Sequence, residues 1–207
     1  MEDIKTNIKQ SMCFLKNHVY GMFITCMLCF IAMTVLFHFL NLDNPEFVQK
    51  TVEELAQTLA KKGADSETGG VNFTSLLLNN LMVSLIAVSW GAVPFVFLST
   101  PVLATNAIAI SVMSAHFVLQ GKSMAIFFAG LLPHGIFEIP ALVLSVAMGL
   151  AISLNSTIRI FKDENTLSFS EMFLTCMKVY AWIVVPLMLL SAITEVYITP
   201  HIMKFFA

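Results

Sequence analysis

Charged side chains are scarce in this sequence, and their scarcity excludes a soluble globular domain. Of the 207 residues, 12% are Asp, Glu, Lys or Arg, whereas 57% are hydrophobic and the mean hydropathy is +0.83. Soluble domains average about 25% charged residues. A chain this short also could not bury so many apolar side chains in one core, because small domains leave much of their surface exposed. We therefore expect an integral membrane protein.

The sequence also lacks an excess of basic residues, and it has only four cysteines. A net charge of -2 and a pI of about 6.2 give no electrostatic support for a nucleic-acid partner. The cysteines are too few for a secreted disulfide scaffold, and Cys26, Cys29 and Cys176 lie in apolar runs. The expected partners are membrane lipid and other membrane or envelope proteins, with a homo-oligomer as an open alternative.

Several apolar segments have the length that crosses a membrane. A polar, basic segment at 1–20 precedes the first span at 22–40, which is too long for a cleaved signal peptide. Further spans are predicted at 73–98, bent near Gly91 and Pro94, and then at 102–119, 133–154 and 175–198. The run 124–154 would be about 46 Å long as one helix. We expect a break near Pro133, which leaves a half-helix at 124–132.

The segment 44–63 predicts an amphipathic helix outside the hydrocarbon. Asn44 suits the N-cap, Pro45 the first turn and Gly63 the C-terminal cap. Its apolar residues share one face, which either lies on the membrane surface or covers the bundle; they are Phe47, Val48, Val52, Leu55 and Leu59. The predicted fold is thus an all-α, polytopic membrane helix bundle in a single domain, 1–207. It has five spans, a broken half-helix and this outer helix, and 73–198 forms a four-span core.

The basic residues predict the orientation of the chain, because Lys and Arg concentrate on the cytoplasmic side of membrane proteins. Lys5, Lys9 and Lys16 precede the first span, and Arg159 follows the fourth. We expect a multi-pass protein of the cell membrane with its N-terminus inside and its C-terminus outside.

Ionisable side chains inside a membrane are costly, so each calls for an explanation. His134 and Glu138 are spaced i, i+4 and therefore share one helical face in the first two turns of the span predicted at 133–154. Pro140 cannot donate a backbone hydrogen bond, which frees the carbonyl group of Ile136 beside Glu138. The pair either fixes helix packing or binds an ion, a proton or a metal.

The predicted topology brings more polar residues to the same depth. Asn79 and Asn80 open the second span and Glu195 ends the last, so both places fall in the outer leaflet with His134 and Glu138. Such convergence is typical of a polar cavity, and equally of a structural polar plug. His134, Glu138 and Glu195 are the candidate ligands of a divalent metal ion. No other cofactor is predicted.

Two further features favour helix packing. Asn106 falls alone toward the inner side, where it would form a hydrogen bond between helices. Small residues recur at every fourth position behind Glu138, and such a face lets helix backbones approach closely; they are Ala141, Ser145, Gly149 and Ser153.

Motifs of known catalytic sites are missing. The sequence has no His-Glu-x-x-His zinc-protease helix and no Gly-x-Ser-x-Gly nucleophile elbow. Gly121-Lys122-Ser123 resembles the end of a P-loop, but His116 stands where that motif needs glycine. No catalytic residue is predicted, and an enzyme is the least favoured class.

The polar positions together resemble a known family. They are Asn79-Asn80, Asn106, the segment Pro133-His134-Gly135-x-x-Glu138-x-Pro140-Ala141, and Ala192-Ile193-Thr194-Glu195 followed by Ile198-Thr199-Pro200. Over 73–200 this pattern resembles the stage II sporulation protein M family. Two places depart from the family's pattern: Ala107 replaces the usual glycine after Asn106, and the second span has Trp90-Gly91 and Pro94 where more glycine is expected.

The resemblance implies a role in the cell envelope. Named members act in engulfment during sporulation, where they are thought to anchor peptidoglycan-degrading partners at the septal membrane without being hydrolases. The first hypothesis is therefore a membrane scaffold that binds partners. The alternative is a small homo-oligomeric transporter or channel that uses the polar site of the outer leaflet, since broken helices often expose backbone to ions. The third is a metal-dependent intramembrane hydrolase.

Overall fold

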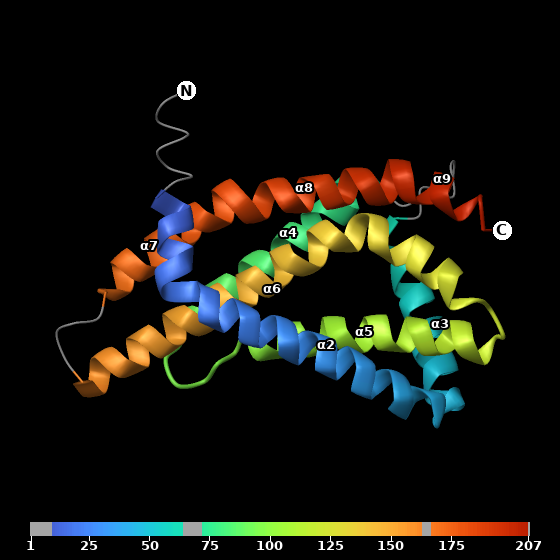
Figure 1. Ribbon diagram of the computed structural model, residues 1–207, viewed down its shortest axis with the longest axis horizontal. Coiled ribbons are helices and arrows are strands. Elements are labelled where there is room, and N and C mark those ends of the chain that lie inside the picture. Colours follow the sequence, from blue (N-terminus) through green and yellow to red (C-terminus); the bar gives the residue numbers. More distant parts are fainter. Residues whose placement is uncertain (1–9, 64–71, 163–166, 207) are drawn as a thin grey trace.

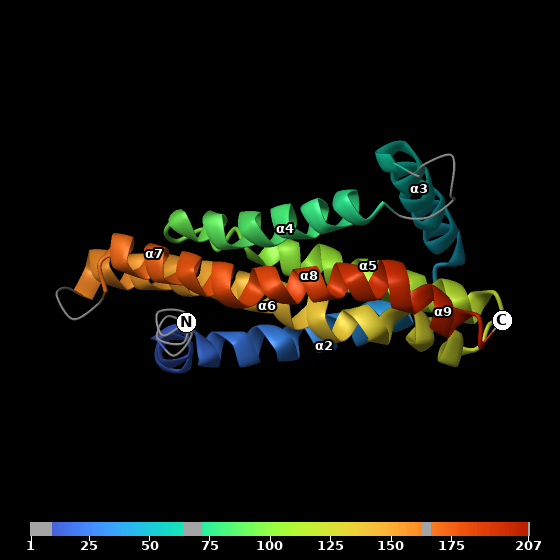
Figure 2. The same cartoon turned by 90° about the horizontal axis from the view of Figure 1, so that it is seen from above.

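The computed structural model describes residues 10–63, 72–162 and 167–206, and every regular element in these ranges is helical. Five helical stretches are long and apolar enough to cross a membrane. They are Gln10–Leu42, Phe73–Ala92, Thr100–Leu119, Met124–Phe161 and Phe169–Met203. They run along the long axis of the molecule (Figures 1 and 2). The structure confirms the predicted all-α membrane bundle.

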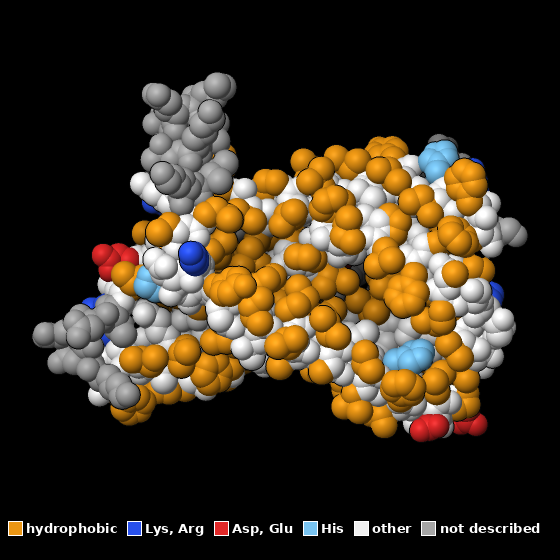
Figure 3. Space-filling model, in the orientation of Figure 1, with side chains coloured by type: hydrophobic (Ala, Val, Ile, Leu, Met, Phe, Trp, Pro, Cys, Tyr) orange, Lys and Arg blue, Asp and Glu red, His pale blue; other side chains and the backbone are white. Residues whose placement is uncertain are grey.

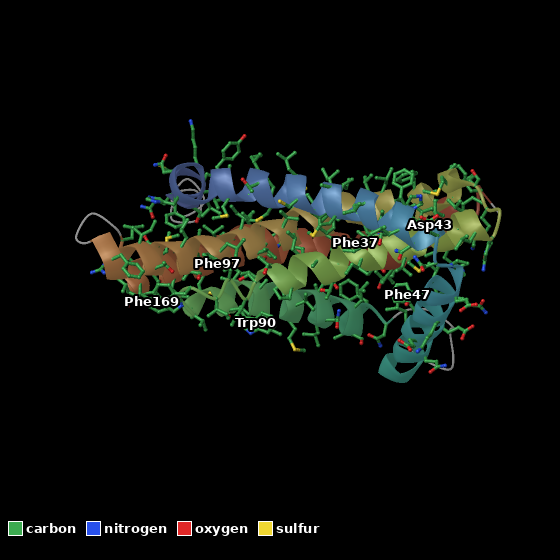
Figure 4. The ribbon with its side chains drawn as sticks, turned by 90° about the horizontal axis from the view of Figure 1, so that it is seen from below. Phe37, Asp43, Phe47, Trp90, Phe97 and Phe169 are labelled. Atoms are coloured by element: carbon green, nitrogen blue, oxygen red, sulfur yellow. The ribbon has the colours of Figure 1, made fainter. Side chains whose placement is uncertain are left out.

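The surface of the bundle has the polarity that a membrane requires. In Figure 3 hydrophobic side chains cover the middle of the visible face, and charged side chains gather toward its two ends. Figure 4 shows Trp90, Phe97 and Phe169 toward one end, and Asp43 and Phe47 toward the other. Trp and Tyr are the aromatic residues that concentrate at membrane–water interfaces, and Trp90 suits such a position.

The first span is followed by the predicted amphipathic helix. The π-helical turn η1 (Leu15–Val19) leads into α2 (Tyr20–Leu42), and α3 (Pro45–Gly63) comes next. The Asn44 amide donates to the Leu40 carbonyl (2.8 Å), so it caps the end of α2. Val48 of α3 is buried against Val112 and Ala115 of α5 (Thr100–Leu119). The helix α3 therefore covers the bundle, and it lies across the direction of the spans (Figures 1 and 2).

The second span ends earlier than predicted. The helix α4 (Phe73–Ser89) and the 3₁₀ turn η2 (Trp90–Ala92) form it, and the chain leaves the helical conformation before α5 begins. Val93 is extended because the residue before a proline is disfavoured in the α region. Pro94 thus follows the end of the helix instead of bending it, and Phe95 and Phe97 take positive φ angles of 68° and 45°.

The structure corrects the break predicted at Pro133. The helix α6 (Met124–Lys162) is continuous, with Pro133 and Pro140 inside it. Residues 124–132 are therefore the first turns of α6 and not a separate half-helix. Proline removes one hydrogen bond without ending the helix, and α6 bends along its length instead (Figure 1).

The last span is longer than the predicted 175–198, and two π-helical turns interrupt it. It consists of α7 (Phe169–Val179), η3 (Tyr180–Val184), α8 (Val185–Ile193), η4 (Thr194–Ile198) and α9 (Thr199–Met203). Ser168 and Glu171 form a capping box at its start. Pro200 does not end the helix as expected, because it lies in the first turn of α9, where proline needs no backbone donor.

The small residues of α6 pack against α4, as their spacing predicts. Ala141, Ser145, Gly149 and Ser153 are all buried. A Cβ atom on Gly149 would overlap the Ala87 carbonyl oxygen of α4. The Ser153 hydroxyl also donates to the Val93 carbonyl (3.0 Å), which ties α6 to the loop after η2.

Candidate functional site

Three ionisable side chains meet inside the bundle. His134 and Glu138 lie one turn apart on α6, and Glu195 comes from η4. One ligand atom of each side chain lies within 4.8 Å of the other two, and all three side chains are partly buried. We call these residues the polar cluster.

The side of the last span that faces α6 carries two polar side chains, Ser191 and Glu195. Ser191 is buried four residues before Glu195, so both lie on one side of the helix. The Ser191 hydroxyl donates to Glu138 Oε2 (3.3 Å). The sequence analysis missed Ser191, although its i−4 spacing from Glu195 was a signal that could have found it.

The polar cluster lines a cavity of about 440 Å³, which we call the large cavity. Its wall also includes Asn106 of α5 and apolar side chains such as Phe30 of α2 and Met113 of α5. A water molecule takes about 30 Å³ in the liquid. The large cavity therefore has room for several waters or for a hydrated ion beside the cluster.

A small cavity of about 150 Å³ adjoins the large one. Asn79 and Asn80 of α4 line it, and Asn106 and Glu138 line both cavities. Asn79 is exposed and Asn80 is buried. The structure thus brings the predicted polar residues of α4, α5 and α6 to neighbouring cavities.

Two predicted placements need correction. Asn106 does not lie apart from the other polar residues but lines the same cavities as Glu138.

His134 and Glu138 are not in the first turns of a helix: α6 begins at Met124, 14 residues before Glu138. That distance is about 21 Å along a helix, so Glu138 lies deeper than expected, at the level of Asn106. The helix dipole contributes little there, because its effect is confined to the first turn.

The charges around the polar cluster are unbalanced. Among the described residues that line the two cavities, none is Lys or Arg. His134 Nδ1 and Asn80 Nδ2 are buried and have no hydrogen-bond partner within the described part of the chain. Two neighbouring carboxyl groups that have only the His134 imidazole beside them, and no Lys or Arg, suit the binding of a cation or a proton.

Polar contacts also connect the first span to α5, and the sequence analysis did not anticipate them. His38 Nδ1 and the Ser114 hydroxyl are 2.7 Å apart, and the Asn41 amide donates to Ser111 Oγ (3.1 Å). These contacts lie outside the large cavity's wall and hold α2 in place. The signal that could have found them was His38, a titratable residue within an otherwise apolar run.

Comparisons with known proteins agree with the pattern of polar residues. The family model of stage II sporulation protein M matches residues 22–200. The chain is also 30% identical over 131 residues to an uncharacterized protein of the archaeon Methanocaldococcus jannaschii. That alignment covers 63% of this chain and 72% of the archaeal protein. No solved structure matches. The family match covers most of the chain, including the whole polar cluster and every residue that lines the two cavities except Met203. The chain therefore belongs to the stage II sporulation protein M family.

Proposed function

We propose that this protein is a membrane scaffold that anchors a cell-envelope complex. Membership of the family supports this role, because the resemblance implies anchoring without hydrolysis. The observation that carries the proposal is the position of α3, which is fixed at one end of the bundle with part of its apolar face uncovered. We call this end the α3 end.

The apolar face of α3 is only partly used within the chain. Val48 is 1% exposed, whereas Phe47 is 52% and Leu55 37% exposed. Exposed charged side chains such as Glu46 and Lys50 flank them. An uncovered apolar strip beside charged residues is typical of a helix that docks into a groove of another protein. We expect this partner to be an envelope protein on the α3 side of the membrane.

Photo-crosslinking in cells of the source organism tests the proposal. A photoreactive residue at position 47 or 55 should capture the same envelope protein, and one at the exposed Ile160, near the opposite end of α6, should not. The captured protein, once purified, should bind wild type and bind Phe47→Glu at least tenfold more weakly. Gln49→Glu adds the same charge at an exposed position on another side of α3; it is the matched control and should bind normally. Crosslinks to lipid alone would assign α3 to the membrane surface and overturn the proposal.

The adjoining cavities favour a second candidate, a small homo-oligomeric transporter or channel for a cation. Glu138 and Asn106 line both cavities and so connect them within the bundle. Under this candidate, the purified protein in liposomes carries a cation flux that Glu138→Gln abolishes. Flux at the level of empty liposomes would exclude this candidate and leave the scaffold unaffected.

A further inference from the structure

We infer that His134, Glu138 and Glu195 bind a divalent transition-metal ion of the zinc class. The inference does not depend on the scaffold role, because it rests on the polar cluster alone. One imidazole and two carboxylates from two helical segments place their ligand atoms within 4.8 Å of one another. Three protein ligands with one open position are typical of zinc sites that keep a bound water.

The ligand types favour zinc over magnesium or calcium. Imidazole nitrogen suits Zn²⁺, Fe²⁺, Ni²⁺ and Cu²⁺, whereas Mg²⁺ and Ca²⁺ prefer shells made of oxygen. Ca²⁺ needs about six to eight oxygen ligands. Among the described residues, the side-chain oxygens of Ser191 and Asn106 adjoin the two carboxylates. With the His134 imidazole in the ligand set, the site is not the all-oxygen shell that Ca²⁺ prefers.

The charge of the cluster matches a divalent cation. With His134 neutral, the two carboxylates carry two negative charges, and no Lys or Arg lines the cavities among the described residues. A divalent ion would neutralise both carboxylates where unpaired charges are costly. His134 Nδ1 is buried, has no hydrogen-bond partner among the described residues, and can act as a ligand.

The helix that carries Glu195 has an irregularity at this residue. Glu195 lies in the π-helical turn η4, and the Thr199 hydroxyl donates to the Thr194 carbonyl (3.1 Å) across it. Single π-helical turns within α-helices often mark functional sites, because they turn a side chain out of the regular register. Here the π-helical turn contains Glu195, the one proposed metal ligand that does not come from α6.

The large cavity provides space for the ion beside the polar cluster and a path to the cluster from the α3 end. Metal bonds of about 2.0–2.2 Å place tetrahedral ligand atoms about 3.3 Å apart. The ligand atoms lie within 4.8 Å of one another, so the side chains need to close by up to about 1.5 Å. The cavity beside them leaves space for this movement and for a water ligand. Its wall also includes Phe117 near the end of α5 and Met203 at the end of α9, so it extends from the cluster toward the α3 end.

Metal binding by the purified full-length protein tests the inference. After treatment with EDTA and removal of the chelator, the protein is titrated with Zn²⁺, and bound zinc is measured after gel filtration. Wild type should bind about one equivalent, and Mg²⁺ or Ca²⁺ in tenfold excess should not displace it. His134→Ala, Glu138→Gln and Glu195→Gln should each bind at least tenfold more weakly.

Matched variants separate metal binding from folding. Glu53→Gln removes an exposed carboxylate on α3 and should bind zinc as wild type does. Glu138→Gln and Glu195→Gln keep the shape of the side chain, so elution as a monodisperse species shows that they fold. The inference is overturned if folded wild type binds no more zinc than these variants, or if zinc binding survives in all three. It is likewise overturned if Mg²⁺ or Ca²⁺ competes equally, since the site would then not be selective for the zinc class.

Discussion

Gly149 and Gly91 mark the place where α6 and the second span are closest. A Cβ atom on Gly149 would overlap the Ala87 carbonyl oxygen and Ser99 Oγ, and one on Gly91 would overlap the backbone of Gly149. Backbone atoms cannot move aside as a flexible side chain can. The contact therefore requires glycine at both positions, and small-residue spacing alone did not single out which of the four α6 residues is essential.

Gly149→Ala should destabilise the protein by about 1–3 kcal/mol or more, because added atoms in a packed contact force the backbones apart. Thermal unfolding in detergent can be followed by labelling the buried Cys26 and Cys176 in a variant with exposed Cys13 and Cys29 replaced by serine. Gly21→Ala is the control: a Cβ there meets nothing within 4 Å, and alanine should leave stability unchanged or raise it by up to about 1 kcal/mol. Equal unfolding temperatures for Gly149→Ala and the parent would contradict the close contact.

At the scale of elements, the helix α3 depends on few contacts. Val48 is buried with Val112 and Ala115 of α5, and Val52 packs partly against this group. The sequence predicted the helix and its apolar face but left open whether that face meets lipid or the bundle. Contact with α5 depends on the path of the chain after α2, which local periodicity does not encode.

Val48→Asp should release α3 from the bundle, because an unpaired carboxylate in this apolar contact is costly. Hydrogen exchange of the α3 amides should become at least tenfold faster while exchange in α6 stays unchanged. Lys50→Asp changes an exposed side chain of the same helix and should alter neither rate. Unchanged α3 protection in Val48→Asp would show that other contacts hold the helix.

Element types were predictable from the sequence, but the ends of elements and the neighbours of single residues were not. Apolar runs and small-residue spacing predicted five spans and the buried face of α6. The effect of a proline was harder to predict: Pro133 lies inside the continuous helix α6, whereas Pro94 follows the end of a helix. The position of Asn106 beside Glu138 was also not predicted. It depends on how deep Glu138 lies in the bundle, and that depth depends on α6 beginning at Met124.

At the scale of the whole molecule, we expect five spans to place the two ends of the described chain on opposite sides of the membrane. The start of α2 and the end of α9 lie at opposite ends of the bundle (Figure 1). The distribution of Lys and Arg predicts that the N-terminal end faces the cytoplasm.

C-terminal reporter fusions test this orientation. Alkaline phosphatase fused after residue 207 should be active, because it folds outside, and green fluorescent protein at the same position should be dark. The reverse result would place the C-terminus inside. Fusions after residue 162, at the end of α6, serve as the internal control and should give the opposite pattern.

The central claim is that the polar cluster is a binding site and not a packing device, and the unfolding temperature of Glu195→Gln tests it most directly. In EDTA the variant should be at least as stable as wild type. Two neighbouring, partly buried carboxylates repel each other, and the substitution removes one of them. Zn²⁺ at 100 times the wild-type Kd should stabilise wild type by about 2.7 kcal/mol and the variant by about 1.4 kcal/mol or less, because the variant binds at least tenfold more weakly. A variant that is less stable than wild type by the same amount in EDTA and in Zn²⁺ would contradict the claim and make the cluster structural.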